Sequence, residues 1–101
     1  MMMAFDSGHT PPSRLDDATV TAVRDALRLY LADDANPGPL QQALLLMSRE
    51  ARDKDMRAEH LLVMLKDTWS SLPEVRGMTD TTEQVRLLQR VVTMCIKEYY
   101  S

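Results

Sequence analysis

Few side chains in this sequence could act as a general acid or base near neutral pH. The histidines are His9 and His60, and imidazole is the side chain whose ordinary pKa lies in that range. His9 stands in a segment with proline, glycine and no apolar period. His60 follows Glu59 in a stretch with helical period, where a solvated polar face accounts for both residues. The sequence therefore indicates no catalytic acid or base.

The carboxylates of Asp53, Asp55 and Glu59 resemble the opening of a calcium-binding loop. Such a loop has glycine at its sixth position and glutamate at its twelfth, whereas this sequence has Ala58 and Met64 there. It has no paired cysteines, no His-Glu-x-x-His spacing, no glycine-rich phosphate loop and no Gly-x-Ser-x-Gly elbow. We therefore expect no metal, no cofactor, no small-molecule ligand and no catalytic residue, and we predict that the chain is not an enzyme.

Cys95 is the one cysteine, and a small chain without internal disulfides is typical of the reducing cytosol. Because it falls in an apolar helical stripe, we expect it to pack like a small hydrophobic residue. The longest apolar runs, residues 43–47 and 61–65, are far shorter than the roughly 20 residues that cross a bilayer. The beginning of the chain also lacks the charged and apolar regions of a secretory signal. These features predict a soluble, cytoplasmic protein that does not enter a membrane.

The composition favours helices. The chain has 101 residues, of which 45% are apolar and 27% charged, and it contains 3 glycines and 5 prolines. That composition fits one globular domain and does not suit a turn-rich β-sandwich. We expect residues 1–12 to be a disordered tail and residues 13–101 to be a single helical domain. The predicted fold is all-α, a compact bundle of four helices at about 14–33, 38–54, 56–72 and 81–100.

Local signals indicate where these helices begin and end. Ser13 is the candidate N-cap of the first helix, and Asp55 is that of the third. Residues 80–83, Asp-Thr-Thr-Glu, form an acidic variant of the capping box before the last helix. We expect residues 73–78 to be a loop, because the residue before Pro73 is driven out of helical geometry.

The helices carry more apolar residues than a four-helix core needs to bury. Leu45 and Leu46 fall outside the inner stripe of the second helix, as Val63 and Met64 do in the third. In the last helix the apolar arc spans about 200°, against the roughly 100° that one core face requires, so this helix is expected to contact more than one neighbour. The candidate interface residues are Leu45, Leu46, Val63, Met64, Val85, Leu88, Val92 and Tyr99.

The remaining side of the last helix is polar. We expect this side to be exposed to water. Its residues are Arg86, Gln89, Arg90, Thr93 and Lys97. Twelve basic and fifteen acidic residues give a net charge of −3. This negative charge argues against binding to nucleic acid phosphates. The short turn between the second and third helices still permits a helix-turn-helix interpretation, in which the third helix would lie in the major groove of DNA. That helix has few cations on its outer face for such contacts.

The segment from Glu50-Ala51-Arg52 to Glu59-His60-Leu61-Leu62 resembles one repeat of the Clp-type chaperone amino-terminal domain. Its turn is shorter than in that family, and no second repeat follows. The resemblance therefore implies no function for this chain.

We therefore predict a small intracellular interaction or regulatory (adaptor) module that binds itself or another protein through apolar helix faces. A homodimer through the last helix is expected, because a chain of this size gains little stability from its own core. The alternative is a helix-turn-helix-like DNA-binding transcriptional regulator.

Overall fold

The structure is a computed structural model, and it describes residues 14–100. Helices account for most of this range, and no strand occurs in it. They are α1 (Asp17–Ala32), α2 (Gly38–Asp53), α3 (Ala58–Ser71), α4 (Pro73–Arg76) and α5 (Thr81–Tyr99). The predicted all-α bundle of four long helices is confirmed. The predicted tail at residues 1–12 and the Ser13 cap lie outside the described residues.

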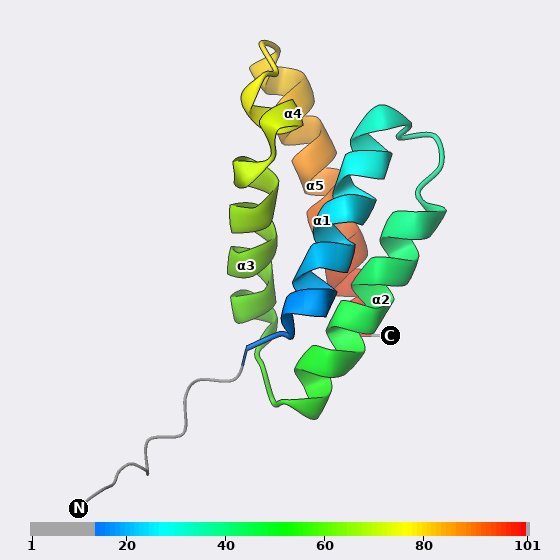
Figure 1. The fold of residues 1–101 in the computed structure, drawn as a ribbon, viewed down its shortest axis with the longest axis vertical. Helices are drawn as coiled ribbons and strands as arrows, with labels where there is room; N and C mark the ends of the chain where they lie inside the picture. The colour runs from blue at the N-terminus through cyan, green and yellow to red at the C-terminus, as the bar shows by residue number, and fades with distance from the viewer. Residues whose placement is uncertain (1–13, 101) are drawn as a thin grey trace, which may run out of the picture.

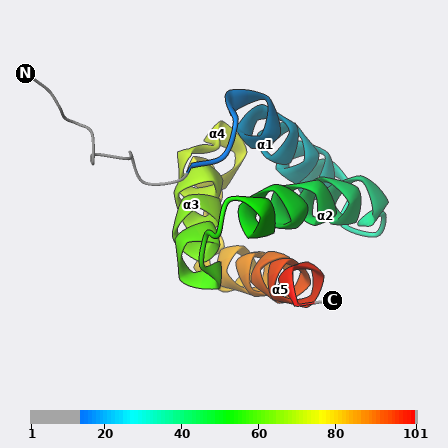
Figure 2. The same ribbon diagram turned by 90° about the horizontal axis from the view of Figure 1, so that it is seen from below.

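The four long helices pack side by side as a bundle. In Figure 1, α1 and α3 run upward, whereas α2 and α5 run downward. Their contacts form a ring in the order α1, α2, α5, α3 (Figure 2). Consecutive helices α2 and α3 therefore occupy opposite corners, and α5 packs against both α2 and α3. This confirms the expectation that the last helix contacts more than one neighbour.

The core is built from one apolar stripe on each long helix, as the 3.6-residue period requires. Trp69 of α3 belongs to this core and is 1% exposed. From α2 the core receives Leu40, Leu44 and Met47, all fully buried. Burial of these side chains from water supplies the main favourable term in folding.

The start of α1 is held by Glu50, a residue of α2. Its carboxylate accepts hydrogen bonds from the Asp16 backbone N–H (2.6 Å to Oε2) and from the Thr19 hydroxyl. Lys54 donates to the same carboxylate (2.7 Å) and to the Arg14 carbonyl (2.8 Å). Glu50 and Lys54 thus form an ion pair four residues apart, and Lys54 also connects the chain before α1 to the end of α2.

The turn between α2 and α3 corrects the predicted role of Asp55. Asp55 does not cap α3, which begins later, at Ala58, after Arg57. Its φ of 57° places it instead in the left-handed position that closes a helix C-terminus. The Asp55 N–H bonds to the Arg52 carbonyl (3.2 Å), and the Met56 N–H bonds to the Ala51 carbonyl (2.8 Å). This is the Schellman pattern that ends α2.

Residues 73–76 also correct a prediction, since they form the short helix α4 where a loop was expected. Pro73 stands at the start of this helix, where proline needs no amide partner. An ion pair between Glu74 and Arg28 of α1 (2.7 Å) ties α4 to the bundle. The expected N-cap of α5 is confirmed, because the Asp80 carboxylate accepts a hydrogen bond from the Glu83 N–H (3.1 Å).

Candidate functional site

Helix α5 buries a narrow face and leaves a broad one outside. The buried residues are Leu87, Val91 and Cys95, spaced four apart on the side that faces the core. Burial raises the pKa of the Cys95 thiol to about 11. A thiol that stays protonated near neutral pH is a poor nucleophile, so the expected packing role of Cys95 is confirmed.

One side of the exposed surface of α5 is apolar. It consists of Val85, Leu88, Val92, Ile96 and Tyr99, which we call the apolar flank. At 3.6 residues per turn these five positions share an arc of about 80°. Val85 is 51% exposed and Ile96 39%, whereas the other three are half-buried.

The apolar flank borders α3. Three of its residues, Val85, Leu88 and Val92, line a depression of about 280 Å³ together with Lys66 of α3. At the far end, the Tyr99 hydroxyl donates to the Met56 carbonyl (2.6 Å), which fixes the ring against the end of the bundle. The predicted interface residues of the last helix therefore lie along one side of α5.

The remaining predicted interface residues lie elsewhere. Val63 is 60% exposed on α3, and with half-buried Met64 it lines a separate depression of about 340 Å³ beside Leu15. Leu46 is exposed and Leu45 half-buried on α2. The structure thus gathers the α5 residues and the α3 residues in different places and does not bring all eight into one groove.

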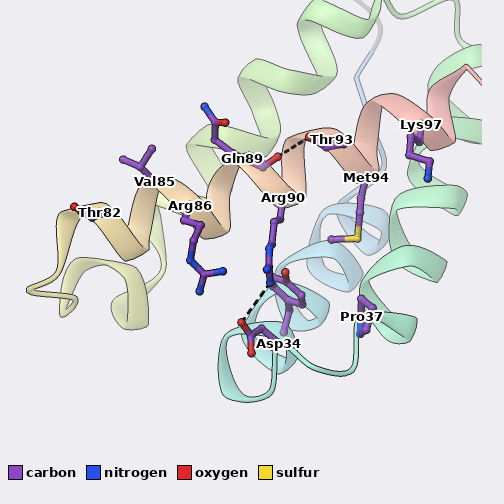
Figure 3. Close-up of a pocket in the computed structure, with 11 residues that line it drawn as sticks. Asp34, Pro37, Thr82, Val85, Arg86, Gln89, Arg90, Thr93, Met94 and Lys97 are labelled. Atoms are coloured by element: carbon purple, nitrogen blue, oxygen red, sulfur yellow. Dashed lines mark hydrogen bonds and ion pairs between the residues drawn. The ribbon is translucent and has the colours of Figure 1, made fainter.

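The other side of α5 is the polar strip, and all five of its residues are exposed as expected. Figure 3 shows Arg86, Arg90 and Lys97 projecting from α5 toward the turn between α1 and α2. Val85 and Gln89 project to the opposite side (Figure 3). Between the cations and the turn lies an open groove of about 840 Å³, which we call the basic groove. Val85 and Gln89 line its other edge.

Ion pairs within the chain partly neutralise the basic groove. Arg90 lies 3.7 Å from the Asp34 carboxylate across it. Arg86 donates from Nε to Glu83 (2.9 Å), a hydrogen bond that raises the pKa of Arg86. Lys97 has no ion-pair partner among residues 14–100. The groove thus keeps a net positive charge in a chain whose total charge is −3.

No catalytic constellation accompanies these surfaces. His60 is exposed in the first turn of α3. In the part of the chain that the structure describes, no three histidine, cysteine or carboxylate side chains gather closely enough to hold a metal ion. Nor does any described helix have the length and apolar character needed to span a membrane.

Sequence reasoning found the polar strip but missed the groove beside it. The opposite wall comes from Tyr30, Asp34 and Pro37, at the end of α1 and in the turn that follows. Nothing in their spacing relates them to α5, because their proximity arises only from packing in the bundle. Exposed Leu29 and Tyr100 were also missed.

Comparisons with protein-family models, curated proteins and solved structures gave no match to this chain.

Proposed function

We propose that this chain is a non-enzymatic interaction module that forms a homodimer through the apolar flank of α5. The observation that carries the proposal is the flank itself, in which five apolar side chains follow one side of a helix and stay open to water to different degrees. Apolar residues at this helical spacing are the anchors by which helices recognise helices.

The spacing of the apolar flank fits pairing with a second copy. It is symmetric about Val92: Leu88 and Ile96 lie four residues to either side, and Val85 and Tyr99 lie seven. In an antiparallel pair of α5 helices with a twofold axis at Val92, Leu88 of one copy faces Ile96 of the other, and Val85 faces Tyr99. A twofold interface requires such self-complementarity.

Sedimentation equilibrium over a wide concentration range tests this proposal. The wild type should form a dimer, and Val92→Glu should be monomeric, because the twofold axis would bring two buried carboxylates together. Val85→Glu changes a more exposed member of the flank, and it should weaken the dimer even if Val92→Glu disturbs folding. Circular dichroism reports whether each variant remains helical.

Val63→Glu is the matched control, since Val63 is also an exposed valine but lies on α3. It should leave the dimer intact. A wild type that stays monomeric at every concentration contradicts the proposal, as does a Val85→Glu dimer of unchanged affinity. Loss of the dimer in Val63→Glu alone would move the interface to α3.

The alternative of a DNA-binding regulator gains no support from α3. Its exposed face carries the carboxylates of Glu59 and Asp67 beside Lys66, its one lysine, whereas base and phosphate contacts favour cations and amides. Salt-sensitive retention of the wild type on duplex DNA would revive this alternative.

A further inference from the structure

The basic groove is a second surface of α5, and it meets the apolar flank at Val85. The cations that edge it project from α5 on the opposite side from Val85 (Figure 3). A copy of the chain docked on the flank would therefore meet the groove at Val85 and leave the row of cations open. What occupies the groove has to be argued from its own charge and shape.

The charge of the groove follows from a row of cations on one helix. Arg86, Arg90 and Lys97 are spaced by four and seven residues, so they lie on one side of α5. At 1.5 Å per residue the row is about 16 Å long. Among the residues that line the groove these three face one carboxylate, that of Asp34. A ligand that complements this row has to carry several negative charges along a similar length.

The groove also has an apolar part. The half-buried side chains of Pro37 and Met94 line it together with the cations, and Tyr30, which is 3% exposed, lies beside them. A purely ionic ligand would leave these groups in contact with water or with charge. A segment that carries both carboxylates and apolar side chains satisfies both parts of the groove.

We propose that the basic groove binds an acidic amphipathic segment of another protein. Its carboxylates pair with Arg86, Arg90 and Lys97, and its apolar side chains contact Pro37 and Met94. The Asp34 carboxylate, 3.7 Å from Arg90, shows that a carboxylate can approach this row. The volume of about 840 Å³ and the length of the row fit a few turns of helix and exceed what one carboxylate or phosphate needs.

Selection from a random display library of peptides about four helical turns long tests the proposal. Wild-type protein should enrich peptides rich in aspartate and glutamate that also carry apolar residues. Reversal of two charges, Arg90→Glu with Lys97→Glu, should lower the affinity for the enriched peptides by at least about tenfold, since like charges repel across an interface. In the wild type, peptide binding should shift the backbone NMR signals of residues 86–97 and of the α1–α2 turn.

Arg24→Glu is the control, because Arg24 is an exposed cation on α1 that does not line the groove. It should bind the enriched peptides like the wild type. The proposal is overturned if no peptide is enriched, if the enriched peptides lack acidic residues, or if the double charge reversal leaves their affinity unchanged. It is overturned as well if duplex DNA or inorganic phosphate shifts the groove signals and the enriched peptides do not.

The same variants separate this proposal from the homodimer. The double charge reversal should sediment as the wild type does, because it leaves the apolar flank intact. Val92→Glu should bind the enriched peptides although it no longer forms the dimer. Each proposal can therefore fail while the other holds.

Discussion

Glu50 is a residue whose ionisation matters for the fold, because its carboxylate holds the start of α1. Partial burial alone would raise its pKa, but hydrogen bonds from Lys54, from the Thr19 hydroxyl and from the Asp16 amide lower the pKa below the ordinary value of 4.5. A carboxyl group with a lowered pKa in the folded state stabilises that state at neutral pH. This contribution to stability begins to decrease as the pH falls below 4.5. It is lost once the pH falls below the lowered pKa that Glu50 has in the folded state.

Glu50→Gln should therefore destabilise the protein by about 1 to 2 kcal/mol at neutral pH, since it replaces charged hydrogen bonds with weaker neutral ones. Urea denaturation at a series of pH values measures the difference in free energy of unfolding between wild type and variant. That difference should shrink as the pH falls below 4.5. Asp67→Asn is the control, because Asp67 is exposed on α3 and has no ion pair among the described residues. A difference that does not depend on pH would refute the role assigned to the Glu50 charge.

Single residues also show where sequence reasoning fails. Asp55 has the residue type of an N-cap and precedes a helix, so its type fits the role that we predicted. The same side chain tolerates positive φ better than most, and Asp55 takes that conformation to close α2. Residue type alone does not separate these two roles; in the structure Asp55 closes α2 and the residue after it, Met56, is buried in the core.

At the scale of elements, the four long helices could be predicted well because each has a long apolar period and clear stop signals, whereas four-residue α4 is too short to have such a period. Within α5, however, the apolar arc is too wide to reveal which of its residues face the core. The structure places Leu87 and Val91 inside and leaves Val85 half exposed, because α2 and α3 contact α5 along one part of the arc. The division into core and flank is thus a property of the packing, which a helical period cannot supply.

The same substitution on the two faces of α5 measures this division. Val91→Ala removes two fully buried methyl groups and should cost about 2 kcal/mol of folding free energy. Val85→Ala changes an exposed position and should cost less than about 0.5 kcal/mol. Urea denaturation of both variants at low protein concentration, where the proposed dimer dissociates, provides the comparison. Equal costs would show that α5 is rotated from the position described.

At the scale of the whole molecule, the order of the helices explains both proposed surfaces. Because α2 and α3 occupy opposite corners, α5 lies between them and has two open borders. The border with α3 exposes the apolar flank, and the border with the α1–α2 turn forms the basic groove. The candidate residues on α5 could be predicted from sequence, but the groove could not, since its two walls meet only in the assembled bundle.

A dimer through the apolar flank should also make thermal stability depend on protein concentration. Association stabilises the folded state by mass action, so the melting temperature of the wild type should rise with concentration. That of Val92→Glu should stay constant, and Val63→Glu should behave like the wild type. Since the contacts of the flank are apolar, the melting temperature should still rise with protein concentration when salt is added. Added salt should weaken peptide binding in the basic groove, because it screens exposed charges. Differential scanning calorimetry at several concentrations and two salt levels measures both dependences. A melting temperature that does not change with concentration in the wild type would mean that the flank stays open in the isolated protein.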